Sequence, residues 1–265
     1  MTRVPGDPAP GAVELGREPG REVRTKARQR AEFLLRYGFD VNFAPVADVA
    51  YQPTSLMAWR SFGSDPSRVA LRVNDFVRGS RTGGMLGAAK HFPGHGRTPV
   101  DSHYAIPEID ISKREWLRSD GLPFQAAVNA GVEMVMLGHL RFPQWDSAPA
   151  SLSRTAVRTL RHDLGFRGII VTDDLGMGAL RGMDPFEAID RALRAGVDLL
   201  LYASYPAPIR DLVNHLRHQV KRGEITEARI DASVRRILRL KILHFGLLER
   251  SARQSGKSKN SGVKG

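Results

Sequence analysis

Residues 84–104, GMLGAAKHFPGHGRTPVDSHY, concentrate side chains that can transfer protons or hold anions. An apolar run leads into a loop rich in Gly and Pro, and this loop carries the reactive residues Lys90, His91, His95, Asp101 and His103. Imidazole and carboxylate groups gathered in one loop suit general acid–base catalysis, because imidazole exchanges protons near neutral pH. Packing alone rarely requires such a cluster.

A second segment, GIIVTDDLGMGA, ends an apolar run with Asp173 and Asp174. A carboxylate held at the end of a rigid strand can act as a nucleophile. Tandem Asp residues after a strand also commonly cap a helix, and this segment alone does not distinguish the two uses. Together with the histidine-rich loop, it favours catalysis by a carboxylate and a histidine.

The histidine-rich loop also offers residue types that bind zinc. Its HFPGH stretch contains Pro and Gly, however, so it cannot form the helix that presents the HxxxH ligands of zinc proteases. Cys is absent from the chain, which excludes a thiolate nucleophile, a disulfide framework and a Cys-based zinc site. We therefore expect catalysis without a metal and without a cofactor.

Apolar runs of strand length occur at residues 41–46, 85–89, 132–137, 168–172 and 197–202. Helical patterns alternate with them, at residues 21–37, 67–80, 119–130, 153–164, 184–195, 207–222 and 227–240. Several joins place a Gly between helix and strand, as in RYGFDVNF, NAGVEMVM, LGFRGIIV and RAGVDLLL. The alternation predicts an α/β fold with a parallel sheet.

The reactive residues follow the carboxyl ends of these strands, where β/α barrel enzymes carry their sites. We predict a TIM-type (β/α) barrel that is incomplete on its N-terminal side, with about five parallel strands instead of eight. An open doubly wound sheet is the alternative, although the chain has neither a GxGxxG nor a GxxxxGK[ST] loop. The expected divisions are an irregular lead at 1–20, a partial barrel catalytic domain at 21–249 and a disordered basic tail at 250–265.

Composition limits the remaining classes of function. The 265 residues carry a formal net charge of +12, but Arg is spread through nearly all of the predicted helices, which indicates background composition more than a nucleic-acid surface. No stretch approaches the ~18 consecutive apolar residues of a membrane span, and the first residues lack the apolar centre of a signal peptide. We expect no nucleic-acid partner, no membrane span and a cytoplasmic location; the basic tail leaves contact with a cell wall or membrane surface as an alternative. The oligomeric state stays open.

Several motifs together resemble one known family: NFAPVADV, RSFGSDP, KHFPGHG followed by DSH, PASLS, and VTDDLGMGA. In this order and spacing, from about Leu35 to Leu248, they are similar to the β-N-acetylglucosaminidase (β-hexosaminidase) branch of glycoside hydrolase family 3. The resemblance implies a barrel enzyme that acts on a GlcNAc-containing glycoside with retention, through a covalent glycosyl-aspartate intermediate.

The resemblance also implies roles for individual residues. Asp173 matches the nucleophile, and His103 matches the acid/base group, with Asp101 orienting its imidazole. The implied substrate contacts, all of them hydrogen-bond donors suited to a polyol, are Arg60, Lys90 and His91.

Three further residues are assigned supporting roles. His95, which lies between two Gly residues, is expected to shape the loop. Asp48 is expected to bond backbone amides, and His139 to support the loop that carries the nucleophile.

The chain departs from the family in one respect. Family members have a D-x-E-G-G-R segment well before the APVADV strand, where it holds the terminal sugar, and this chain has none. We therefore expect roughly the first two or three strand units of the barrel to be missing, which would expose two sheet edges. A mis-assigned start, a truncated gene and a deliberate fragment all predict this sequence, and a signal in the missing region would imply an exported lipoprotein.

The leading functional hypothesis is an exo-β-N-acetylglucosaminidase that releases terminal GlcNAc from cell-wall muropeptides or related glycosides. Two alternatives stay open. One is an inactive remnant with at most weak sugar binding. The other is a glycoside phosphorylase, because a histidine acid/base tolerates an anionic acceptor better than a carboxylate would.

Overall fold

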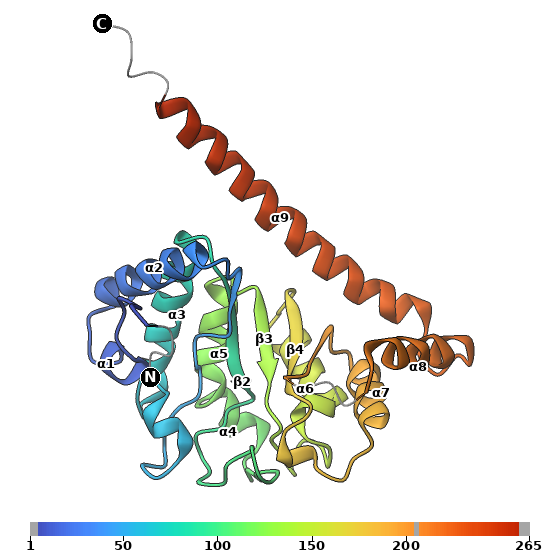
Figure 1. Ribbon diagram of the computed structural model, residues 1–265. Helices are drawn as coiled ribbons and strands as arrows, with labels where there is room; N and C mark the ends of the chain where they lie inside the picture. The colour runs from blue at the N-terminus through green and yellow to red at the C-terminus, as the bar shows by residue number, and fades with distance from the viewer. Residues whose placement is uncertain (1–4, 204–206, 260–265) are drawn as a thin grey trace, which may run out of the picture.

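Parallel strands form the centre of the computed structural model, which describes residues 5–203 and 207–259 (Figure 1). The sheet of five strands has the order of the sequence: β1 (Val41–Asn42), β2 (Leu86–Phe92), β3 (Met134–Leu137), β4 (Ile169–Asp174) and β5 (Leu199–Leu201). β1 is shorter than expected, but Val46 still bridges to Lys90 of β2. The strands curl into half of a barrel, which confirms the prediction of an α/β, incomplete TIM-type barrel.

Helices alternate with the strands: α2 (Gly20–Arg36), α3 (Pro66–Thr82), α5 (Gly121–Asn129), α6 (Arg154–Arg158), α7 (Pro185–Ala195) and α8 (Ile209–Lys221). The predicted Gly joins are confirmed as positive-φ turns, at Gly38, Gly131, Gly165 and Gly196. Gly196 ends α7 with a φ of 114°, a left-handed conformation that sends the chain straight into β5. Two short helices, α1 (Ala12–Leu15) and α4 (Lys113–Leu117), lie in the connections.

The outer face of the sheet packs on these helices in one large apolar core. Val135 and Ile170 from the strands contribute to it together with Val73 of α3 and Phe124 of α5. Burial of such a side chain contributes about 1.5–3 kcal/mol each. α2 and α3 lie close together because Gly79 has no side chain: a Cβ there would lie 2.3 Å from the Arg24 carbonyl oxygen. This packing holds the strands, and therefore their carboxyl ends, in place.

The inner face is covered at the amino ends of the strands by helix α9 (Glu227–Lys259). Met134 and Ile169 form a small second core there with Ile237 and Leu240 of α9. The reactive residues follow the opposite, carboxyl ends of the strands.

A buried carboxylate attaches α9 to the sheet. Asp198, just before β5, accepts hydrogen bonds from Ser233 Oγ at 2.6 Å and Arg236 Nη1 at 2.9 Å on α9. Its second oxygen accepts from Arg161 Nη2 at 2.6 Å. A buried carboxylate is tolerated because these donors satisfy it.

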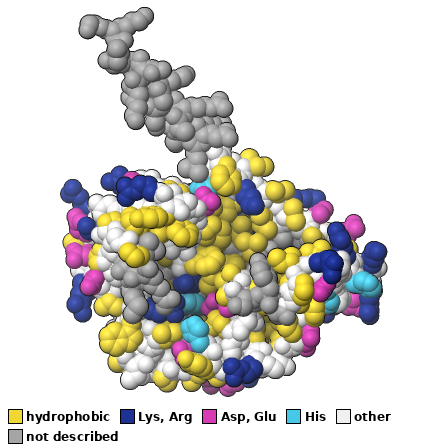
Figure 2. Space-filling model, in the orientation of Figure 1, with side chains coloured by type: hydrophobic (Ala, Val, Ile, Leu, Met, Phe, Trp, Pro, Cys, Tyr) yellow, Lys and Arg dark blue, Asp and Glu magenta, His cyan; other side chains and the backbone are white. Residues whose placement is uncertain are grey.

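Figure 2 shows hydrophobic side chains gathered on the concave face of the half-barrel. Phe43, next to β1, is 38% exposed, and Val41, Leu86, Leu199 and Leu201 of the strands are partly exposed. Within residues 5–203 and 207–259, β1 and β5 each have one neighbouring strand, so each leaves one edge of the sheet unpaired.

Helix α9 reaches further than the sequence indicates. We expect a helix at 227–240 and disorder at 250–265, but α9 continues to Lys259, and 260–265 lie outside the described residues. Proline is absent from this stretch, so no residue in it lacks the backbone N–H of a helix. The lead at 1–20 contains α1 and the first residue of α2. Among the described residues no helix is both long and apolar enough to span a bilayer.

Candidate functional site

Asp173 lies near the carboxyl end of β4, with its side chain 17% exposed. Its Oδ1 accepts a hydrogen bond from the Asp174 amide at 2.9 Å. Burial raises the pKa of Asp173, but electrostatic attraction to His91, the hydrogen bond from the Asp174 amide, and attraction to His139 and Lys90 outweigh burial and hold it below the ordinary value of 3.8. The carboxylate is therefore ionised at neutral pH and reachable from solvent.

His91, near the end of β2, is the side chain that faces Asp173. Its Nε2 lies 4.0 Å from Asp173 Oδ2 and 3.4 Å from Arg60 Nη2, while its Nδ1 lies 2.7 Å from Asp48 Oδ2. Arg60 can only donate, so the neutral ring donates Nδ1–H to Asp48 and accepts at Nε2. The tautomer of His91 is therefore set by its two neighbours.

Asp48 is fully buried after β1 and bonds the histidine-rich loop at several points. Besides the His91 ring, it accepts from the His91 amide at 3.2 Å and from the His95 amide at 2.8 Å. Burial raises its pKa, yet electrostatic attraction to the two histidines and their hydrogen bonds lower it below 3.8. These contacts fit the expected structural role, although the sequence reasoning missed the bond to the His91 ring.

His95 is buried inside the same loop. Its Nε2 lies 3.0 Å from Ser102 Oγ, across the turn that leads to Asp101 and His103. Burial lowers its pKa, so the ring stays neutral. These contacts indicate that His95 holds the loop in its conformation and does not take part in the reaction.

The Asp101–His103 pair lies on the outside of the loop. His103 Nδ1 is 2.6 Å from Asp101 Oδ1, and the two side chains are 54% and 31% exposed. Asp101 also accepts from the His103 amide at 2.9 Å. Burial raises the pKa of Asp101, but these bonds to His103 hold it below 3.8. The imidazole is thus oriented by an ionised carboxylate and open to water.

The backbone of the histidine-rich loop is bonded to the segment that follows β4. Gly178 N donates to the His103 carbonyl at 3.1 Å, and Ala179 N donates to the Ser102 carbonyl at 3.3 Å. A Cβ on Gly178 would lie 2.3 Å from the His103 carbonyl oxygen, so the contact requires Gly. Among the described residues, no hydrogen bond or ion pair joins the His103 ring to Asp173.

The structure therefore brings one part of the predicted site together and keeps the other separate. Arg60 and His91 are in contact beside Asp173, and Lys90 contributes charge to it. The Lys90 Nζ lies 6.0 Å from the centre of the Phe43 ring, on the inner side of the half-barrel. Asp101 and His103 are connected to this cluster through the backbone hydrogen bonds of their loop to the segment after β4.

His139, after β3, bonds the chain at Asp174. Its Nε2 donates to the Asp174 carbonyl at 2.8 Å, so its Nδ1 accepts from the Ser151 hydroxyl at 2.7 Å. Burial lowers the pKa of His139, which keeps the ring neutral. Asp174 itself accepts from the amides of Gly176 and Ala203. Ser151 was missed by the sequence reasoning; its place in PASLS was the available signal.

The histidines of the loop have separate partners. His91 bonds Asp48, His95 bonds Ser102, and His103 bonds Asp101. Among the described residues, no three His, Asp or Glu side chains gather in an arrangement that would hold a metal ion.

Comparisons with known proteins identify the family of the chain. Residues 2–240 match the model of the glycosyl hydrolase family 3 N terminal domain. A β-hexosaminidase from Pseudomonas aeruginosa is 40% identical over 192 residues, 72% of this chain and 55% of its own. The β-hexosaminidase LpqI from Mycobacterium tuberculosis is 36% identical over 251 residues, 89% of this chain and 63% of its own.

A solved structure of a family 3 β-N-acetylglucosaminidase from Paenibacillus sp. str. FPU-7 superposes with a TM-score of 0.87 at 33% identity, covering 92% of this chain and 48% of the other. The chain thus spans about half the length of several of the relatives that it matches. The matched family model, the identities and the shared fold together establish that the chain belongs to glycosyl hydrolase family 3.

Proposed function

We propose that this chain carries the catalytic centre of a retaining exo-β-N-acetylglucosaminidase, which releases terminal GlcNAc from cell-wall muropeptides or related glycosides. The observation that carries the proposal is Asp173: a partly exposed carboxylate with a lowered pKa, beside His91 at the mouth of the half-barrel. The relatives named β-hexosaminidase support the choice of sugar.

In the proposed first step, Asp173 attacks the anomeric carbon and the bond to the leaving oxygen breaks. The attack needs an ionised carboxylate at neutral pH, and the lowered pKa of Asp173 meets this need. The Asp174 amide bonded to Oδ1 holds the carboxylate in one orientation, leaving Oδ2 on the side of His91. The product is a glycosyl ester on Asp173.

His103 is the proposed acid/base group. Its Nδ1–H donates to Asp101, which leaves Nε2 to carry the exchanged proton. It protonates the leaving oxygen in the first step, then accepts a proton from the water that hydrolyses the ester, with net retention. The exposed ring lies on a loop bonded to the segment after Asp173, and a movement of this loop toward Asp173 would bring the ring to the substrate.

Arg60, Lys90 and His91 are the proposed contacts to the sugar. The guanidinium and the ammonium can donate to hydroxyl groups or to the acetamido carbonyl. His91, whose Nδ1–H is committed to Asp48, would accept at Nε2 from a hydroxyl group. The Arg60 donor now at 3.4 Å from Nε2 would turn toward the sugar.

Trapping of the covalent intermediate tests the proposal. A fluorinated β-GlcNAc that forms the ester quickly and hydrolyses slowly should add one sugar mass to the chain, on the peptide that contains Asp173. Asp173→Asn should abolish labelling and lower hydrolysis of an aryl β-GlcNAc by roughly 10³-fold or more. Asp174→Asn is the matched control, because an amide oxygen can still accept from the Gly176 and Ala203 amides.

Three results would contradict this assignment. Labelling at another residue would remove Asp173 from its role. A folded chain that neither hydrolyses nor becomes labelled would favour the inactive remnant. Release of GlcNAc 1-phosphate in place of GlcNAc when phosphate is added would favour the phosphorylase, which the solvent-exposed His103 also allows.

A further inference from the structure

The histidine-rich loop has a buried part and an exposed part, and the two meet near Arg97. Residues 91–96 are buried, whereas residues 99–100 and 103–105 are exposed. The exposed part carries His103, the proposed acid/base group. Arg97, whose side chain is 23% exposed, lies directly after the buried part.

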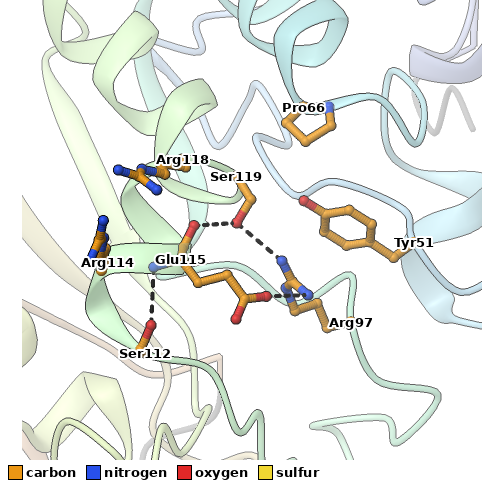
Figure 3. Close-up of a pocket in the computed structure, with 8 residues that line it drawn as sticks. All are labelled: Tyr51, Pro66, Arg97, Ser112, Arg114, Glu115, Arg118 and Ser119. Carbon is orange, nitrogen blue, oxygen red and sulfur yellow. Dashed lines mark hydrogen bonds and ion pairs between the residues drawn. The ribbon is translucent and has the colours of Figure 1, made fainter.

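Arg97 attaches the loop to the junction of α4 and α5. Its Nε lies 2.7 Å from Asp120 Oδ2, its Nη2 donates to Ser119 Oγ at 3.0 Å, and its Nη1 lies 3.3 Å from Glu115 Oε1. The guanidinium also lies 4.4 Å from the centre of the Tyr51 ring. Figure 3 shows Arg97 between Tyr51 on one side and Glu115 and Ser119 on the other. Each guanidinium nitrogen has a partner, so the group is held in one orientation.

The main partner of Arg97 is itself fixed. The Asp120 side chain is 2% exposed, and the residue directly precedes α5, which packs in the large core. A Cβ on Gly94 would lie 3.2 Å from Asp120 Oδ1, so the loop backbone passes close to this carboxylate. Trp116 of α4 donates from Nε1 to the Pro93 carbonyl at 2.6 Å. Arg97 therefore joins the loop to a well-packed part of the molecule.

The proposed function requires His103 to approach Asp173. In the described part of the chain, no hydrogen bond or ion pair joins these two side chains. A moving segment returns often to one productive position only if its end is fixed, and a misplacement of about 1 Å can lower a rate by ~10²-fold. The contacts of Arg97 fix such an end six residues before His103.

We propose that Arg97 is a positioning residue for His103. Its contacts end the rigid part of the loop, so that residues 98–104 turn about a fixed point and bring the imidazole to the leaving oxygen. Without these contacts the loop shifts from Gly94 onward, and the ring is in place less often. Arg97 acts through His103 and does not touch the substrate. The inference rests on the proposed acid/base role of His103, and separate variants test the two.

Two aryl β-GlcNAc substrates test the proposal, because only one of them needs a proton from His103. Phenolate is a poor leaving group that requires protonation, whereas 2,4-dinitrophenolate leaves without it. Arg97→Gln should lower kcat/KM for the phenyl substrate by roughly 10- to 100-fold and for the dinitrophenyl substrate by less than about threefold. An equal loss for both substrates would show a general structural effect and would overturn the proposal.

His103→Gln is the reference for this dependence on the leaving group. R97Q/H103Q should be no less active than H103Q alone, because Arg97 acts only through the imidazole. R97K keeps the charge but not the planar fork, so it should recover only part of kcat/KM. If H103Q lacks the dependence, the proposed function fails. If H103Q shows it and R97Q does not, Arg97 is not a positioning residue.

The chain offers a matched control where α2 meets the lead. Arg30 Nε lies 2.7 Å from Asp7 Oδ2, the same atom types and distance as in the Arg97–Asp120 pair, and the two side chains are 14% and 7% exposed. R30Q should therefore lower the melting temperature much as R97Q does, while leaving the ratio of the two kcat/KM values unchanged. The same change of ratio in R30Q would refute a specific role for Arg97.

Hydrogen exchange tests the attachment of the loop without any turnover. The amides of residues 94–98 should exchange at least about tenfold faster in R97Q than in the unchanged chain, because the local contacts that protect them are lost. R30Q and H103Q should keep the original rates at these amides. Unchanged exchange in R97Q would show that other contacts fix the loop, which would overturn the proposal even in a chain that does not hydrolyse the substrates.

Discussion

Two carboxylate–histidine pairs in this chain have nearly the same geometry and opposite surroundings. In the first, Asp48 Oδ2 lies 2.7 Å from His91 Nδ1, with the side chains 0% and 6% exposed. In the second, Asp101 Oδ1 lies 2.6 Å from His103 Nδ1, with the side chains 31% and 54% exposed. Distance alone does not separate their roles.

Exposure to solvent and additional hydrogen bonds distinguish the two pairs. The Asp48 carboxylate also holds the amides of His91 and His95, so loss of its charge would release the loop. The Asp101–His103 pair has a ring open to water, and among the described residues its carboxylate hydrogen-bonds His103 alone. We infer that the buried pair supports the site and that the exposed pair transfers protons.

The largest expected effect is on the exposed pair. His103→Gln should lower kcat for an aryl β-GlcNAc about 10²–10⁴-fold, the usual contribution of an acid/base group. Its thermal melting should change little. Added azide should restore turnover of a substrate with a good leaving group, because azide attacks the glycosyl ester without a general base. Unchanged kcat would place proton transfer elsewhere.

The buried pair should show the opposite pattern. Asp48→Asn removes one partner of a buried, charge-assisted network and should lower the free energy of unfolding by about 3–5 kcal/mol. Denaturant titration measures this loss in the free energy of unfolding. Asp101→Asn, at the exposed pair, should cost about 1 kcal/mol or less. Equal losses of stability in the two variants would remove the contrast between the pairs.

A smaller effect is expected where the histidine-rich loop meets the segment after β4. Gly178→Ala would put a Cβ 2.3 Å from the His103 carbonyl oxygen, so the two segments must separate. We expect a loss of about 1–3 kcal/mol in stability, together with a lower kcat, because the loop carries His103. Gly182→Ala offers a control for the loss of a nearby Gly, since its Cβ meets no atom within 4 Å and only its φ of 91° is strained.

The smallest effect concerns pH. Burial lowers the pKa of His95 and His139 below the ordinary 6.5, so the unfolded chain takes up protons near pH 6.5 while the folded rings stay neutral. Their stabilising effect is full above pH 6.5 and is lost as pH falls below it. The melting temperature should therefore begin to fall there, before Asp48, Asp101 and Asp173 titrate. His139→Gln should flatten the decline.

Carboxylates would shape the curve at lower pH. The pKa values of Asp48, Asp101 and Asp173 lie below 3.8, so their contributions are present above pH 3.8 and are lost only as pH falls through these lower values. A decline confined to pH below 4 in the unchanged chain would contradict the role given to the buried histidines.

Much of the fold could be predicted because local sequence patterns indicate its strands, its helices and the turns between them. The apolar runs and the Gly residues at 38, 131, 165 and 196 indicate strands and joins, and all are found. The extent of α9 could not be predicted in this way. Its sequence beyond Leu248 consists of polar and small residues without an apolar period, although its backbone has no proline to end the helix.

The candidate site was only partly predictable for a related reason. Residue types and their places after strands identified Asp173, His91 and His103 as reactive, but not which histidine faces Asp173. That depends on the bond between Asp48 and His91, residues 43 positions apart, and on the docking of Gly178 against His103. The sequence gives no measure of such distances.

The amino-acid sequence by itself determined the alternation of strands and helices, the placement of acids and bases at strand ends, and the family. These depend on local periodicity and on residue type. Only the tertiary structure decided which carboxylate–histidine pair is buried and which is open to water. Burial and charge balance arise when distant segments pack together, and no local pattern contains them.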